Sequence, residues 1–222
     1  VRVSGATAIP TLRLDEVTGA ERTEAIKNYV NELETYVGTL EAKHKELHAG
    51  STNANVSSYA YDQKNCFLNA TEITLDNMMY SLPATQVWRA LSGAADPAEQ
   101  LSNAIAAMEQ QIDYFYQFKG MNRAATDKDA YPFTRLNIRY HQMFTGAFMY
   151  AGGKHIGIEF GSAGGVFTLS PIVADENGKY ISGRLTGWGI AHEMGHCINA
   201  AAYQRVEVTN NVFAQLAKTG GG

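Results

Sequence analysis

The chain is poor in cysteine and proline and has no long apolar run. Its 222 residues include two cysteines and five prolines. Two cysteines are too few for the disulfide framework of a small secreted domain, and Cys197 is expected to be a small buried thiol. The most apolar region, TGAFMYAGGKHIGIEFGSAGG, is interrupted by Lys154, His155 and Glu159. That pattern excludes a transmembrane helix, so we expect no membrane insertion.

Basic charge is scarce as well. The chain has 18 lysines and arginines against 22 aspartates and glutamates, a net charge of −4, and no basic tract. This balance argues against a nucleic acid or an anionic membrane as partner. With 45% hydrophobic and 18% charged residues, the chain has the composition of an ordinary globular protein. Its length suits a single sizeable domain.

Helical periodicity dominates the first half. Thr18 and Glu21 form a capping-box pattern ahead of a long predicted helix. Its apolar positions follow helical spacing: Ile26, Tyr29, Val30, Leu33, Tyr36, Val37 and Leu40. Asp96 and Pro97 open a second predicted helix that ends at Gly120. Its apolar face consists of Leu101, Ile105, Met108, Ile112 and Phe115.

Short strands are predicted around these helices. Residues 1–15 read as two strands around Pro10, and CFLNATEITL reads as one strand that leads to a turn at Pro83. Apolar residues then alternate in two further segments, 136–140 and 155–160.

Glycine-rich residues 151–153 and 161–165 are predicted turns, and Asn177-Gly178 is a predicted hairpin turn. Two helices, at about 187–203 and 206–217, complete the chain. A helical first half, a small sheet and terminal helices predict an α+β fold.

The segment GWGIAHEMGHC carries the strongest functional signal. At about 100° per residue, His192 and His196 share one face of the predicted helix, and Glu193 is offset from both. The opposite, apolar face consists of Ile190, Met194, Cys197, Ile198 and Ala201. Two histidines one turn apart can both bind a tetrahedral zinc ion, and the offset glutamate can act as general base. Glu207, on the next predicted helix, is the candidate third ligand.

Spacing alone does not define such a site. His44 and His48, in HKELH, are also four residues apart on a predicted helix. No glutamate follows His44 directly, and His44 continues the apolar stripe of its helix. We interpret this pair as ordinary surface or core-edge histidines. The alternative interpretation of HEMGH, without a metal site, is an amphipathic helix with a polar solvent face.

HEMGH followed by EVTNNVFAQ resembles the enhancin-like, mucin-targeting zinc metallopeptidases, a family of gluzincin type. IPTLRLD, the LP of YSLPATQVW, and TGAFMYAGGKHIGI extend the resemblance upstream. It implies a zincin-like catalytic domain with a small mixed sheet, an HExxH active-site helix and additional long helices. It also implies His192, His196 and Glu207 as ligands of one catalytic Zn²⁺ and Glu193 as general base.

The resemblance implies an endopeptidase that cleaves glycoproteins, commonly O-glycosylated mucin-type substrates, outside the cell or at its surface. Glycan-binding modules are expected elsewhere in the parent chain, and Asn210 or Asn211 is expected to orient the second helix. The chain begins without Met or a signal peptide and ends on three glycines. We therefore expect residues 1–222 to be a single zinc metallopeptidase catalytic domain, a piece of a longer protein that lacks a C-terminal helical part.

Two other functions remain open at this point. One is a non-catalytic glycan- or glycoprotein-binding module with a structural zinc, and the other is a zinc hydrolase that acts on something other than peptides. Glu193 and an open fourth ligand position favour catalysis, because a structural zinc needs neither. Tyr150, His155 and Tyr203 are all candidate oxyanion donors. Trp188 either packs in the core or stacks on a sugar or peptide.

Overall fold

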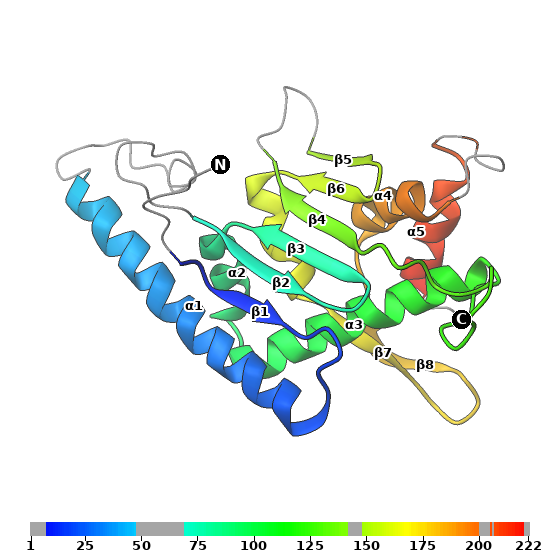
Figure 1. Ribbon diagram of the computed structural model, residues 1–222, viewed down its shortest axis with the longest axis horizontal. Helices are drawn as coiled ribbons and strands as arrows, with labels where there is room; N and C mark the ends of the chain where they lie inside the picture. Colours follow the sequence, from blue (N-terminus) through cyan, green and yellow to red (C-terminus); the bar gives the residue numbers. More distant parts are fainter. Residues whose placement is uncertain (1–7, 48–68, 142–147, 200–204, 206, 220–222) are drawn as a thin grey trace.

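The computed structural model describes residues 8–47, 69–141, 148–199, 205 and 207–219. In this part of the chain, helices pack against one face of a mixed sheet, and a separate hairpin projects below it (Figure 1). The strands are β1 (Thr11–Arg13), β2 (Thr71–Thr74), β3 (Met78–Leu82), β4 (Leu136–Tyr140), β5 (Met149–Gly152), β6 (His155–Ile158), β7 (Ser170–Ala174) and β8 (Tyr180–Arg184). The helices are α1 (Gly19–Leu47), α2 (Ala84–Leu91), α3 (Pro97–Phe118), the 3-10 helix η2 (Phe160–Phe167), α4 (Trp188–Ile198) and α5 (Asn210–Thr219). The predicted α+β fold is confirmed.

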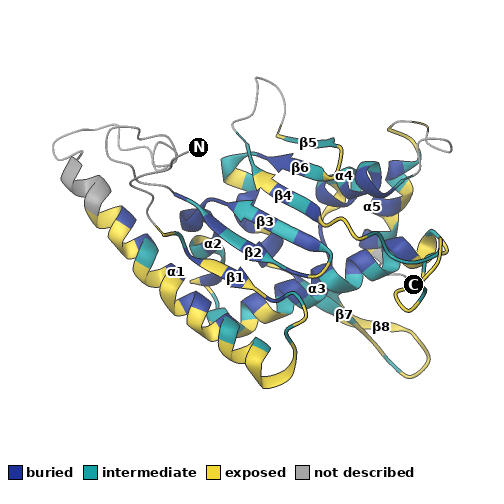
Figure 2. Cartoon of the chain, viewed as in Figure 1, coloured by how far each residue is buried: buried dark blue, intermediate teal, exposed yellow. Residues whose placement is uncertain are grey.

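The main sheet has an apolar face and a polar face. Its strand order is β1-β2-β3-β4-β6-β5, in which β2–β3 and β5–β6 are antiparallel and the other pairs are parallel. Leu136, Ile138 and Ile156 are fully buried under the helices, whereas Arg139 and His155 point to the opposite face. Buried and half-buried positions alternate along the central strands (Figure 2). The predicted period of two is therefore confirmed in β4, and the antiparallel strand β5 forms one edge of the sheet.

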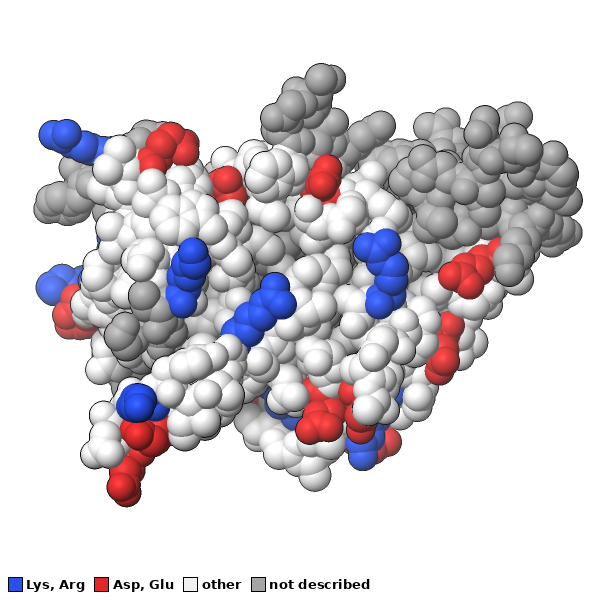
Figure 3. Space-filling view, turned by 180° about the vertical axis from the view of Figure 1, so that it is seen from behind, with Lys and Arg blue, Asp and Glu red and all other residues white. Residues whose placement is uncertain are grey.

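Surface charge is dispersed. On the side of the molecule seen in Figure 3, lysines and arginines stand apart from one another, and the acidic residues lie mainly toward the edges of the view. The presence of both signs of charge on this side is consistent with the small net charge of −4. Among the described residues, no helix combines the length and the apolar character needed to cross a membrane.

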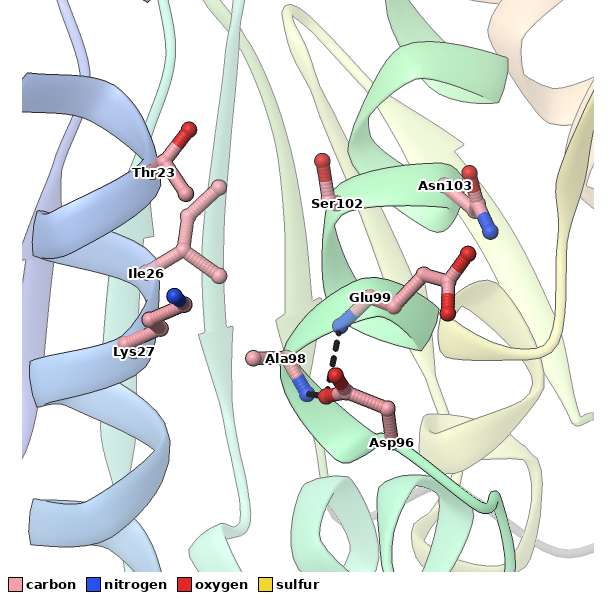
Figure 4. A pocket seen from close by; sticks show the side chains of 8 residues that line it. All are labelled: Thr23, Ile26, Lys27, Asp96, Ala98, Glu99, Ser102 and Asn103. Carbon is pink, nitrogen blue, oxygen red and sulfur yellow. Dashed lines mark hydrogen bonds between the residues drawn. The ribbon is translucent and has the colours of Figure 1, made fainter. Parts of the chain in front are cut away.

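The two long helices form where periodicity predicts them. Six of the seven predicted apolar positions of α1 are buried, and Tyr36 is half-buried. All five predicted positions of α3 are buried. Asp96 caps α3, because its Oδ1 accepts the backbone N–H groups of Ala98 and Glu99 at 2.9 and 3.1 Å (Figure 4). The side chains of His44 and His48 lie outside the described part of the chain.

Two elements after β2 were not predicted. The chain returns from β2 as the antiparallel strand β3, and α2 begins directly after Pro83. The predicted turn at Pro83 is thus the junction of β3 and α2. Proline offers α2 no side-chain cap, so the usual Ser, Thr, Asp or Asn signal for a helix start is missing. Of the two strands predicted around Pro10, the second is β1, and the first falls outside the described residues.

The glycine-rich segments differ in their outcome. Residues 161–165, predicted as a turn, belong to the 3-10 helix η2. A Cβ atom at Gly164 would lie 2.8 Å from the carbonyl oxygen of Gln86, so glycine permits the close packing of η2 on α2. The predicted hairpin turn at Asn177-Gly178 is confirmed between β7 and β8, where Gly178 has a φ of 78°.

Both terminal helices are shorter than predicted. α4 ends at Ile198 because Asn199 has an extended backbone, with φ −67° and ψ 145°. α5 begins at Asn210 and not near residue 206. Glu207 therefore precedes the second helix, and its predicted position on that helix is wrong.

Candidate metal centre

Helix α4 divides into the two faces that the sequence predicts. Ile190, Met194, Cys197 and Ile198 are buried, and Ala201 lies outside the described residues. His192, Glu193 and His196 are half-buried. The apolar face anchors the helix, so the polar face is held in a fixed position.

Three side chains bring metal-binding atoms together beside α4. The Nε2 atoms of His192 and His196 lie 3.1 Å apart. One carboxylate oxygen of Glu207 lies 3.0 Å from Nε2 of His192, and the other lies 3.4 Å from Nε2 of His196. One ligand atom from each residue falls within 4.8 Å of the other two. The predicted ligand set therefore meets at one point, although Glu207 reaches it from a different element than expected.

A tight turn directs Glu207 toward the histidines. The backbone N–H groups of Val208 and Thr209 both donate to the carbonyl of Arg205 at 3.0 Å. Glu207 itself has a φ of 69°, in the left-handed region that non-glycine residues rarely occupy. Such a conformation costs on the order of 1–3 kcal/mol and is found mainly at functional sites.

Two asparagines of α5 hold the imidazole rings. Oδ1 of Asn211 lies 2.9 Å from Nδ1 of His192, and Nδ2 of Asn210 lies 2.6 Å from Nδ1 of His196. Asn210 is completely buried. Metal-binding histidines commonly donate their second ring N–H to an acceptor, which fixes the ring and leaves the other nitrogen for the ion. The Asn211 oxygen is such an acceptor for His192. The sequence suggested only that one of them orients the helix, yet both follow Glu207 at helical spacing.

Glu193 stands beside the cluster without being part of it. Partial burial raises the pKa of its carboxyl group. His196 and His192 act in the opposite direction, and the negative charge of Glu207 adds to the increase. This position, next to the ligand atoms and partly shielded from water, suits a proton acceptor more than a ligand.

Close packing of α4 on its neighbours sets the geometry of the site. A Cβ atom at Gly195 would lie 3.0 Å from Cδ2 of Phe213 and 3.2 Å from Asn210, so only glycine lets α5 approach this closely. Lys154, in the β5–β6 turn, donates to the carbonyl of Cys197 at 2.9 Å. The thiol of Cys197 is buried as predicted, and burial raises its pKa to about 11.

A buried glutamine fixes the entry to α4. Gln111, on α3, is fully buried, and its Oε1 accepts the backbone N–H of Thr186 at 2.9 Å. Its Nε2 donates to the Thr186 hydroxyl and to Sδ of Met194. Gln111 was not singled out in the sequence, because a lone polar residue inside an amphipathic helix carries no recognisable pattern.

The other predicted site residues have mixed outcomes. Tyr150 packs edge-on against the ring of His155, with centroids 5.5 Å apart, and Nε2 of His155 lies 2.8 Å from the guanidinium of Arg139. These contacts are on the outer face of the sheet. Tyr203 is outside the described residues. Trp188 is 46% exposed, so it lies at the surface and not in the core.

A groove of about 280 Å³ also separates α1 from α3 (Figure 4). Thr23, Ile26 and Lys27 face Ala98 and Ser102 across it. α1 packs on β1, at the edge of the sheet opposite β5 and α4. The groove is therefore separate from the metal-binding cluster.

The mixed sheet with its helices is the fold of zincin-like metallopeptidase catalytic domains. Residues 57–219 match the family model of peptidase M60, enhancin and enhancin-like. This match covers most of the chain, and the chain belongs to that family. The expected family is thus confirmed.

Solved structures with the same fold come from Clostridium perfringens. The ZmpB metallopeptidase is 22% identical, with a TM-score of 0.64 over 98% of this chain and 34% of that chain. The M60 catalytic domain of ZmpC, in complex with the sialyl T antigen, is 19% identical, with a TM-score of 0.64 over 96% and 33%. The catalytic module of the metalloprotease ZmpA is 19% identical, with a TM-score of 0.61 over 95% and 33%. The chain therefore spans about a third of these relatives, and it matches no curated protein.

Proposed function

We propose that the chain is the catalytic domain of a zinc endopeptidase that cleaves glycoproteins, with O-glycosylated mucin-type proteins as substrates. The observation that carries this proposal is the convergence of His192, His196 and Glu207 within 4.8 Å. Membership of the M60 family supports peptidase chemistry. The sialyl T antigen bound to ZmpC supports a glycoprotein substrate.

The donor set fits zinc. Two imidazole nitrogens and one carboxylate form a common set of protein ligands for a catalytic zinc ion, and they leave a fourth position open. Oδ1 of Asn211 can accept the Nδ1–H of His192, which leaves Nε2 of His192 for the metal. The amide of Asn210 would do the same for His196 with its oxygen, instead of its nitrogen, turned toward the ring. A zinc ion held by His192, His196 and Glu207 would supply a Lewis acid and lower the pKa of water.

Glu193 moves the proton in this proposal. Its carboxylate accepts a proton from the attacking water and delivers it to the nitrogen of the leaving amine. The carboxylate is well placed because α4 positions it one residue from His192, outside the set of ligand atoms.

The proposed substrate class also implies a place of action. Mucin-type substrates are extracellular, so we infer that the protein works outside the cell or at its surface. One relative, ZmpB of C. perfringens, has a solved structure in which CBM51 domains accompany the M60 catalytic domain. We infer that glycan-binding modules accompany this chain too, and that it has no nucleic-acid partner.

The proposal is tested by zinc analysis and O-glycopeptide cleavage on the same samples. We expect one zinc per chain in the wild type. Glu207→Ala should lose zinc and cleavage, because one ligand is gone. Glu193→Gln should keep zinc and lose cleavage, because an amide cannot accept the proton. Glu176→Gln, in the exposed β7–β8 turn, is the matched control and should behave as wild type.

Two results would contradict the proposal. Cleavage by Glu193→Gln at the wild-type rate would remove Glu193 from the mechanism. Zinc binding without cleavage by the full-length protein would favour a non-catalytic binding module with structural zinc. Unglycosylated peptides and simple esters, assayed in parallel, define the class of substrate.

A further inference from the structure

An open, apolar surface depression of about 400 Å³ adjoins the metal-binding cluster. We call it the Trp188 cavity; its lining residues are Trp188, Val208, Asn211, Val212, Gln215 and Leu216. Two of them connect it directly to the cluster. Val208 follows Glu207 in the chain, and Asn211 contacts His192 at 2.9 Å. Anything bound in the cavity therefore lies beside the metal ligands.

The cavity exposes large apolar side chains. Trp188 is 46% exposed, Val208 63% and Val212 44%. Exposed apolar surface is unfavourable at about 25 cal/mol per Å², and contiguous patches of it often mark binding sites. Trp188 comes from the start of α4 and Val212 from α5, so the two helices form opposite walls of one depression.

The side chains of the lining offer few polar groups. Oδ1 of Asn211 is bonded to His192, and its Nδ2 donates to the carbonyl of Glu207 at 2.9 Å. The amide of Gln215 and the indole N–H of Trp188 are the other polar groups that side chains contribute to the lining. A sugar needs several hydrogen-bond partners for its hydroxyl groups, whereas an apolar side chain needs none. The lining therefore favours an apolar side chain over a sugar ring.

We propose that the Trp188 cavity binds an apolar side chain of the peptide substrate, on a residue that flanks the scissile bond. This inference rests on the proposed function and adds a peptide preference to it. The preference acts through burial of that side chain against Trp188 and Val212. Selectivity is thus expected from the protein part of the substrate as well as from its glycan.

The test compares two O-glycopeptides that differ only at the flanking residue, phenylalanine in one and alanine in the other. We expect kcat/KM to be on the order of 10-fold higher for the phenylalanine peptide, since pocket burial of this size gives that degree of discrimination. Trp188→Ala should reduce this ratio by removing one wall. Val212→Trp should reverse it, because the larger ring fills the cavity and leaves room only for alanine.

The control is Phe133→Ala, which removes a fully exposed aromatic side chain from the loop before β4. It should leave the ratio unchanged. Zinc content must equal that of the wild type in all variants. A changed ratio then cannot result from damage to the metal site. Equal cleavage of both peptides by the wild type would overturn the inference. It would also be overturned if Trp188→Ala and Val212→Trp slowed cleavage of the two peptides by the same factor, because the ratio would then be unchanged.

Peptide binding supplies a second measurement that does not require cleavage. In Trp88→Phe, Trp188 is the remaining tryptophan, so its fluorescence reports occupancy of the cavity. The phenylalanine peptide should shift the emission to shorter wavelength at lower concentration than the alanine peptide. Such binding without cleavage would refute the proposed catalysis but keep the cavity assignment. An equal shift with the free glycan would refute the assignment and identify a sugar site.

Discussion

Gly195→Ala tests whether the contact between α4 and α5 holds the metal centre. The new Cβ atom would lie 3.0 Å from Cδ2 of Phe213 and 3.2 Å from both Cα and Cβ of Asn210. Two of these three atoms belong to the residue that contacts His196. α5 must therefore shift, and the hydrogen bond to the His196 ring is disturbed.

The expected magnitude follows from two opposing effects. Alanine is more favourable than glycine inside a helix by about 0.8–1 kcal/mol. Overpacking a tight contact costs about 1–3 kcal/mol. We expect a net loss of about 1 kcal/mol in the free energy of unfolding. Zinc affinity should fall about 10-fold or more, as when the hydrogen-bond partner of a metal-binding histidine is lost.

Gly38→Ala is the matched control. Gly38 is an exposed residue of α1, and a Cβ atom there would meet nothing within 4 Å. It should gain up to about 1 kcal/mol from helix propensity alone. Urea unfolding in the presence of a chelator measures stability without the metal, and competition with a chromogenic chelator measures zinc affinity. If Gly195→Ala is stabilised like Gly38→Ala and binds zinc as the wild type does, the packing argument is wrong.

Three further predictions follow from the site. Asn211→Ala should weaken zinc binding by about 10–100-fold in chelator competition, because the His192 ring loses its hydrogen bond. The control Asn177→Ala, in a distant turn, should leave zinc affinity unchanged. Gln111→Leu should lower the free energy of unfolding in urea by about 1–3 kcal/mol, because the buried N–H of Thr186 loses its acceptor. An unchanged unfolding curve would contradict that role. Zinc at 100 times its dissociation constant should stabilise the chain by about 2.7 kcal/mol, and Glu207→Ala should show no such gain in thermal unfolding.

Long-range periodicity explains which elements could be predicted. α1 and α3 each repeat an apolar stripe over many turns, and Asp96 adds a cap that is visible in the sequence. β3 and α2 are short, and Pro83 between them resembles a turn. Their boundaries depend on pairing with β2 and on packing against η2, which involve residues distant in the sequence.

The arrangement of side chains at the candidate metal centre could also be predicted only in part. The spacing of His192 and His196 is a property of one helix, so the sequence reveals it directly. Glu207 could be named as a candidate ligand, but its left-handed backbone could not be predicted, because glutamate has no preference for that conformation. The contacts of Asn210 and Asn211 arise only when α5 folds back on α4, which Gly195 permits.

If the three candidate ligands bind a metal as proposed, their unequal exposure has a consequence for how the metal is exchanged. The side chains of His192 and His196 are 12% and 18% exposed, whereas that of Glu207 is 68% exposed. The histidines are fixed on a packed helix, and the carboxylate is carried by a strained turn at the surface. We therefore expect the ion to enter and leave on the Glu207 side, with release of this carboxylate as the slow step. A chelator should then strip the metal at a rate set by the turn, while the sheet and its helices remain folded.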